Sequence, residues 1–98
     1  MEQFTFERLE KLVGDKMSMS LDDGTSVDVE ITGVTRTGTH SKTWESFALY
    51  LDSSGLNGAV EQGTYLFGHD SLGEASLFVS PNSEKELEVI FSRKVTHA

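Results

Sequence analysis

Apolar residues near the start of the chain recur at the spacing of one face of a helix. Between residues 5 and 13 these positions are Phe6, Leu9, Leu12 and Val13. Thr5 can cap the first turn, and Gly14 can end the last one. With Thr5 as the cap, Phe4 and Leu9 have the spacing of a hydrophobic staple. The pattern predicts one short helix over about residues 5–13.

The period of the apolar residues changes to two from Lys16 onward. The alternating apolar residues are Met17, Met19 and Leu21, followed by Val27, Val29 and Ile31. Such alternation is typical of antiparallel strands with one face in water, and Asp22-Asp23-Gly24 can form the turn between them. The alternation breaks after Ile31, because Gly33 occupies the next inward position. We therefore predict strands over about residues 16–21 and 25–36, with a β-bulge at Gly33.

Four further segments with strand-like alternation follow, at about residues 44–51, 60–68, 74–80 and 86–94. The segment 44–51 carries apolar residues on both faces, so it can be buried on both: Phe47, Leu49 and Leu51 on one, Trp44, Ala48 and Tyr50 on the other. Short turns without intervening helices favour an antiparallel barrel or sandwich over a parallel α/β fold. The expected fold is mostly β, with about six strands and one short N-terminal helix.

Composition limits the classes of partner. The 98 residues suit a single domain, here the whole range 1–98. Sixteen acidic against eight basic side chains give a net charge of -8, which argues against binding to nucleic acid. No cysteine is present, so disulfides and thiol chemistry are excluded. The sequence lacks an apolar run of the roughly 20 residues that cross a bilayer, and its start lacks a signal-peptide pattern, so we expect a cytoplasmic protein without membrane contact.

The residues that could carry chemistry do not form a recognisable site. His69-Asp70-Ser71 contains the residue types of a hydrolase triad, but consecutive residues cannot align nucleophile, base and acid. His40, His69 and His97 fall in a predicted loop, a strand end and the C-terminal tail, which does not suit a metal site. Asp70 or Ser71 can instead form a turn before Leu72-Gly73. We expect no catalytic residue, no metal and no cofactor.

A set of motifs in the second half resembles a family of short bacterial proteins that carry a domain of unknown function. The motifs are Gln62-Gly63-Thr64-Tyr65, His69, Leu72-Gly73, Leu77-Phe78 and Pro81. Further matches are Phe4, Val13-Gly14, Phe47-Ala48-Leu49 and Val89-Ile90-Phe91. The resemblance implies a bacterial source, a compact β-rich unit and, for some members, an association with phage-tail-like surface proteins. It supplies no catalytic residue, cofactor or substrate, and Gly55-Leu56-Asn57-Gly58 departs from it like an insertion.

The leading hypothesis is a non-catalytic protein-interaction or assembly module, because strand edges pair readily with partners. Candidate contact residues are Trp44, Gln62, Tyr65 and His69, which combine hydrogen-bonding capacity with apolar area. Each also has a structural alternative. Trp44 can be a core residue on the second face of its strand or an exposed contact residue, and its expected place is the core, since large aromatic residues are usually buried. Gln62, Tyr65 and His69 can tie a strand end to its turn by buried hydrogen bonds.

Two other functions remain as alternatives. A small-molecule carrier would hold an apolar ligand in a barrel or sandwich mouth near Trp44, Tyr50 and Tyr65. A hydrolase using His69 and a carboxylate is the least favoured hypothesis. The sequence leaves open the oligomeric state, the strand order and the identity of any partner.

Overall fold

Six strands and one helix make up the computed structural model of the chain, which describes residues 4–21, 24–38, 44–54, 60–83 and 85–94. The elements are α1 Phe6–Lys11, β1 Lys16–Ser20, β2 Ser26–Arg36, β3 Trp44–Asp52, β4 Gly63–His69, β5 Gly73–Pro81 and β6 Glu86–Lys94. No helix within these ranges is long and apolar enough to cross a membrane.

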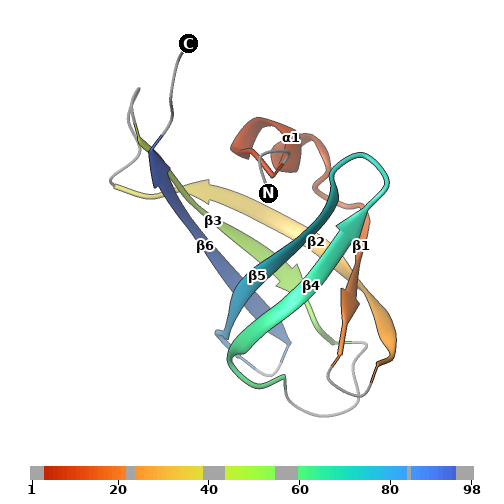
Figure 1. Ribbon diagram of the computed structural model, residues 1–98. Coiled ribbons are helices and arrows are strands. Elements are labelled where there is room, and N and C mark those ends of the chain that lie inside the picture. Colours follow the sequence, from red (N-terminus) through yellow and green to blue (C-terminus); the bar gives the residue numbers. More distant parts are fainter. Residues whose placement is uncertain (1–3, 22–23, 39–43, 55–59, 84, 95–98) are drawn as a thin grey trace.

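The strands close into an antiparallel barrel in the order β1-β2-β3-β6-β5-β4, with β4 pairing back onto β1 (Figure 1). This strand order confirms the expected mostly β fold and shows that the fold is a barrel and not a sandwich. β1 with β2, β2 with β3, β4 with β5, and β5 with β6 are neighbours both in sequence and in space. β3 instead pairs with β6, and β4 with β1, which closes the sheet.

The predicted β-bulge at Gly33 is confirmed. The register of β2 against β3 shifts between Ile31 and Gly33. On the opposite side of β2, the Ile31 N–H donates to the Asp15 carbonyl and the Gly14 N–H donates to the Ile31 carbonyl, each at 2.8 Å. Ile31 is thus bonded to the segment that leads into β1, and the bulge lets β2 bend to continue its ladder with β3.

The barrel interior is filled by side chains from all six strands. The largest fully buried residues are Phe4, Phe47, Phe67, Phe91, Leu9, Met17, Met19, Ile31, Leu49, Leu51, Leu87 and Val29. Phe47 and Phe91 stack with ring centroids 4.6 Å apart, and Phe6 of α1 meets Phe47 edge-on at 5.8 Å. These contacts seat α1 over one end of the barrel (Figure 1).

Helix α1 begins as predicted and ends earlier. The Arg8 N–H donates to Oγ1 of Thr5 at 3.2 Å, so Thr5 is the N-cap. Phe4 and Leu9, at the staple positions, are both fully buried. The helix ends at Lys11, because Leu12 already has a non-helical conformation and the chain turns at Gly14, whose φ is 96°.

Other differences from the sequence prediction lie at element ends and on β3. β4 starts at Gly63 rather than near residue 60. Ser46 and Ala48 on the outer face of β3 are each 3% exposed, so the middle of this strand is buried on both faces as expected. Burial does not extend to Trp44 at the start of the strand. The predicted turn at Asp22-Asp23 and the Gly55–Gly58 loop lie outside the described residues, as do His40 and His97.

Candidate functional site

His69, the last residue of β4, has both ring nitrogens engaged within the protein. Its ring is 8% exposed. Nδ1 accepts a hydrogen bond from the Ser71 N–H at 2.9 Å, so the proton of the neutral ring resides on Nε2. Nε2 lies 3.0 Å from Oδ2 of Asp15 and donates to it. The histidine therefore joins the β4–β5 turn to the segment between α1 and β1.

Asp15 is held in its charged form by this contact. The hydrogen bond from His69, and after it the Lys16 N–H that donates to Oδ1 at 2.9 Å, lower the pKa of the Asp15 carboxyl below its ordinary value. A general base needs a nitrogen lone pair within reach of the substrate proton. In this arrangement His69 has none to offer, because Nδ1 accepts from the backbone and Nε2 carries the proton donated to Asp15.

An open cleft of about 630 Å³ lies beside this histidine. Its lining is dominated by acidic groups, with a single lysine: Asp15, Asp28, Asp70, Glu74 and Lys16 are among the residues. Two of its lining residues approach closely: the Ser18 hydroxyl donates to the Gly68 carbonyl at 3.2 Å, and a Cβ at Gly68 would lie 3.0 Å from Oγ of Ser18. Among the described residues, no three histidine or carboxylate side chains are grouped so that they could hold a metal ion. Carboxylates therefore outnumber basic side chains around this cleft.

The four contact residues proposed from the sequence do not meet in one place. Gln62 is exposed just before β4, and Tyr65 is half-buried, with its hydroxyl donating to the Glu61 carbonyl at 2.7 Å. His69 lies at the far end of the same strand. Trp44 is on β3, which β6 and β5 separate from β4 in the barrel. Tyr65 and His69 thus bond within the protein, but these hydrogen bonds are exposed rather than buried, and only the one from the Ser71 N–H to His69 joins the strand end to its following turn.

Trp44 lies on the outer wall of the barrel, so its expected place in the core is wrong. Its side chain is 39% exposed, and Nε1 donates to Oγ of Ser92 on β6 at 2.9 Å. Phe47, Leu49 and Leu51 point inward, so Trp44 faces outward with Ser46 and Ala48. The two small residues in the middle of the strand are covered on that face, whereas the large indole at the first position of β3 is not. The hydrogen bond to Ser92 draws the indole across the neighbouring strand.

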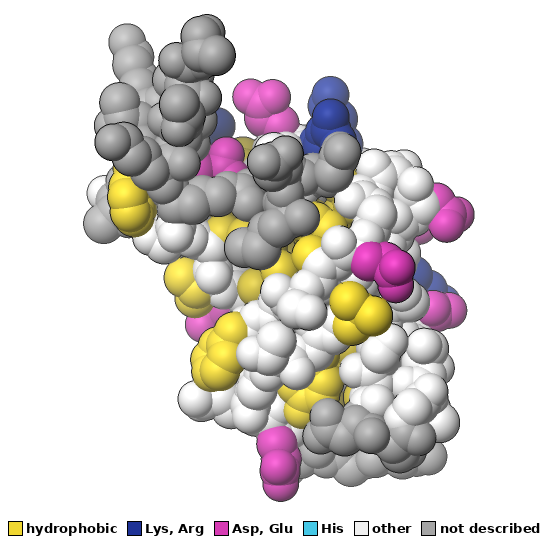
Figure 2. Space-filling view, in the orientation of Figure 1, with side chains coloured by type: hydrophobic (Ala, Val, Ile, Leu, Met, Phe, Trp, Pro, Cys, Tyr) yellow, Lys and Arg dark blue, Asp and Glu magenta, His cyan; other side chains and the backbone are white. Residues whose placement is uncertain are grey.

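Trp44 is one of four large apolar residues exposed on neighbouring strands of the wall, which we call the outer band. The members are Trp44 on β3, Ile90 on β6, Phe78 on β5 and Leu66 on β4, with exposures of 39%, 55%, 52% and 41%. Figure 2 shows patches of hydrophobic side chains on the face that these strands form. Monomeric proteins rarely gather large exposed apolar residues in this way without a use for them.

The register places these residues near one another. Ser80 of β5 and Glu88 of β6 form the last pair of the β5–β6 ladder, and Phe78 and Ile90 are the next outward residues beyond that pair on their own strands. Ile90 is also opposite Ala48 of β3. Leu66 is opposite Ser76 on β5, which makes Phe78 its diagonal neighbour, within reach of a large side chain. The outer band therefore lies on the outside of four consecutive strands of the barrel, with Leu66 and Phe78 as diagonal neighbours and with Phe78 and Ile90 on the two sides of the end of the β5–β6 ladder.

Sequence reasoning found only Trp44 among these four residues. A signal for the others was present, because Leu66, Phe78 and Ile90 each stand between two apolar or aromatic residues, as in Leu77-Phe78-Val79. Strict alternation would place a polar residue at each of these outward positions. Apolar residues at both the odd and the even positions of a strand indicate that both of its faces are apolar.

A family comparison adds to this geometry. The family model DUF6916, described as a domain of unknown function, matches residues 4–91. The match runs from the buried Phe4 to the buried Phe91 and so covers the helix and all but the end of the barrel. No curated protein and no solved structure matches the chain. As the resemblance seen in the sequence implied, the chain belongs to the DUF6916 family, a domain of unknown function.

Proposed function

We propose that this small barrel is a non-catalytic protein-interaction or assembly module that binds its partner through the outer band. The observation that carries the proposal is the exposure of Trp44, Leu66, Phe78 and Ile90 on one wall. Aromatic residues are enriched at protein interfaces, and burying a large apolar side chain contributes about 1.5–3 kcal/mol. Two or three such residues buried together supply a substantial part of a specific contact.

The alternatives receive less support from the same geometry. The barrel interior holds Phe47, Phe67 and Phe91 as packed core, so a carried molecule would have to displace core side chains. Tyr50 is on the outer face of β3, whereas Tyr65 packs against the core of β4, so the aromatic residues proposed for a carrier do not surround one space. A hydrolase reaction at His69 would first have to break one of its two hydrogen bonds.

The association with phage-tail-like proteins that the resemblance implies fits the same proposal. An assembly contact uses a rigid surface, and the ladders of β3 with β6 and of β4 with β5 hold all four members of the outer band in the described barrel. Such a rigid wall presents its side chains without a large entropic cost on binding.

Affinity capture from a lysate of the host organism tests this proposal. The tagged protein is compared with the double variant Phe78→Ser/Ile90→Ser and with Val13→Ser, which removes a residue of similar exposure (46%) that lies outside the outer band. We expect one stoichiometric protein to be retained by the wild type and by Val13→Ser and to be lost with the double variant. Equal retention by all three, or no specific retention, would contradict the proposal.

A further inference from the structure

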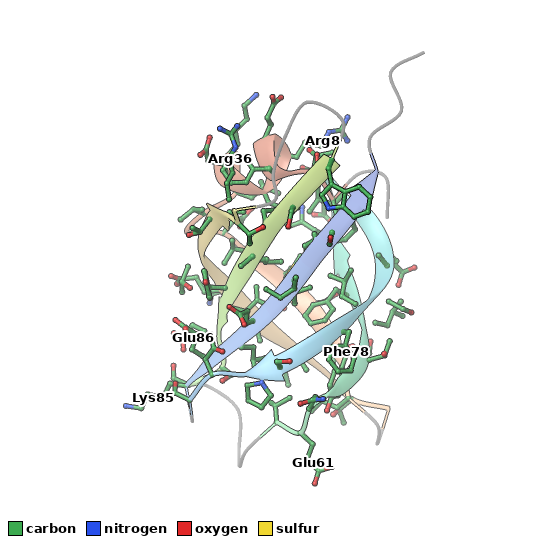
Figure 3. The ribbon with its side chains drawn as sticks, turned by 90° about the vertical axis from the view of Figure 1, so that its left-hand side faces the viewer. Arg8, Arg36, Glu61, Phe78, Lys85 and Glu86 are labelled. Atoms are coloured by element: carbon green, nitrogen blue, oxygen red, sulfur yellow. The ribbon has the colours of Figure 1, made fainter. Side chains whose placement is uncertain are left out.

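The ladder that joins β5 to β6 in the closed barrel is short and leaves a seam between the two strands where no pairing is formed. The two strands pair only at Ser80 with Glu88 and at Pro81 with Leu87. By contrast, β6 pairs with β3 along the whole range from Trp44 to Asp52. Figures 1 and 3 both show β5 and β6 meeting at one end and then diverging. Over Gly73–Val79, β5 thus has a backbone ladder on its β4 side alone.

The backbone groups that face this seam can be identified. The Asn82 N–H donates to the Glu86 carbonyl at 2.9 Å, which closes the turn between the strands. In an antiparallel ladder every second residue exchanges hydrogen bonds with a given neighbour. The row that includes Asn82 and Ser80 therefore continues with Phe78 and Ser76, whose N–H and C=O groups point toward β6.

These groups meet no continuation of the ladder within the described part of the chain. The partner row on β6 continues from Glu88 to Ile90 and Ser92, and it likewise faces the seam. Phe78, Ser76, Ile90 and Ser92 are all exposed. An exposed strand edge of this kind is a template for pairing with another extended chain.

The seam is a strand edge and not a hole into the core. Leu77 and Val79 of β5 are 2% and 0% exposed, and Val89 of β6 is 2% exposed, so the inward side chains seal the interior. Phe78 and Ile90 project outward on the two sides of the seam where the pairing stops, as the position of Phe78 in Figure 3 illustrates. An added strand would find hydrogen-bonding groups along its backbone and apolar side chains on either side.

The charge around the seam favours a basic segment over a second copy of this chain as the added strand. Glu74 lies at one end of the free β5 edge and Glu88 at the other, and the chain has a net charge of -8. A second copy would bring the same negative charge and the same two glutamates to the seam, which opposes self-pairing. A basic segment would be attracted instead.

We infer, resting on the proposed function, that the partner binds by adding an extended, basic strand to the β5 edge along Glu74–Phe78. Alternate apolar side chains of that strand pack against Phe78 and Ile90, and its lysine or arginine side chains meet Glu74 and Glu88. The backbone of Ser76 lies in the middle of the contact. This is β-strand addition, in which main-chain hydrogen bonds supply affinity and side-chain contacts supply specificity.

Selection from a random peptide display library tests the inference, with Ser76→Pro as the central variant. Proline removes the seam-facing N–H of Ser76 and leaves the ladder with β4 intact, because Leu77 and Ala75 carry the β4 bonds in this register. Ser76→Thr is the matched control, since it keeps the N–H in a residue suited to strands. Denaturant unfolding of Ser76→Pro verifies that it folds.

The expected result is enrichment of peptides that combine lysine or arginine with alternating β-branched or aromatic residues. The selected peptides should bind Ser76→Pro at least about tenfold more weakly than the wild type, and Ser76→Thr like the wild type. Hydrogen exchange of the Ser76 and Phe78 amides in the wild type should slow by at least about tenfold when such a peptide is bound. This second measurement does not depend on the proline variant.

Several results would overturn the inference. They are an absence of enriched peptides, enrichment of acidic peptides, equal binding to Ser76→Pro, and unchanged exchange at Ser76 and Phe78. Protection of these amides by concentration-dependent dimerisation of the protein alone would identify a second copy as the occupant instead. If lysate capture is lost with Phe78→Ser/Ile90→Ser but kept with Ser76→Pro, the proposed function stands and strand addition fails. The reverse pattern would leave only main-chain pairing at the β5 edge and would reject both the outer band and the packing of the added strand against Phe78 and Ile90.

Discussion

Replacing Phe47 with alanine should cost far more stability than the same replacement at Phe78. Phe47 is fully buried, stacks on Phe91 at 4.6 Å and meets the ring of Phe6 at 5.8 Å. Its removal leaves a cavity where β3, β6 and α1 meet. Phe78 is 52% exposed on the outer face of β5, so its truncation opens no cavity in the interior.

The magnitudes separate the two variants clearly. Truncation of a buried phenylalanine costs about 3–5 kcal/mol, out of a total stability of about 5–15 kcal/mol for a domain of this class. A loss of about 4 kcal/mol corresponds to a fall in Tm of about 20 °C for a chain of this length. Phe78→Ala loses strand preference and partial burial, together worth about 1 kcal/mol.

Urea unfolding followed by far-ultraviolet circular dichroism measures both free energies. The dependence of the free energy on urea should be the same for the wild type and both variants, so that the midpoints compare stability directly. A cost for Phe47→Ala below about 1.5 kcal/mol, or equal costs for the two variants, would refute the assignment of Phe47 to the centre of the core.

Three further predictions follow from local geometry. Gly73 has a φ of 76°, so Gly73→Ala should destabilise the protein by about 1–2 kcal/mol in urea unfolding. Gly38 has open space around it and no positive φ, so Gly38→Ala should leave the stability nearly unchanged. Equal losses of stability in the two variants would contradict this prediction. Asp15 has a lowered pKa, so its contribution to stability is present above the unfolded value of about 3.9 and is lost as pH falls through the lower folded pKa. The difference in Tm between the wild type and Asp15→Asn should therefore shrink over that acidic range, and a difference that is constant with pH would reject the contact with His69 as its source. Acrylamide should quench the fluorescence of Trp44 in the free protein, because the indole is 39% exposed. A bound partner that covers the outer band should reduce this quenching. Strong resistance to quenching in the free protein would place the indole in the core.

Much of this fold could be predicted from residues close together in the sequence. The alternation of Met17 and Met19 with polar residues produces a strand wherever one face is buried, whatever lies across from it. Thr5 caps a helix through an atom three residues away, and Gly33 marks a bulge by interrupting the alternation within its own strand. Such features depend on local backbone and side-chain chemistry, so sequence reasoning identified them.

The features that bear on function depend on which strands become neighbours. His69 and Asp15 are 54 positions apart and meet only because β4 pairs back onto β1. The sequence showed on which face of its strand Trp44 lies, but whether that face contacts core or solvent depends on what packs against the outside of the barrel. The seam exists because β5 pairs with β6 only at Ser80 and Pro81 and diverges from it over residues 73–79, and the divergence of two strands is a property of the closed barrel that no local spacing encodes. The sequence by itself thus determined the elements and their inward faces, whereas the tertiary structure alone decided the strand order, the outer band and the open edge.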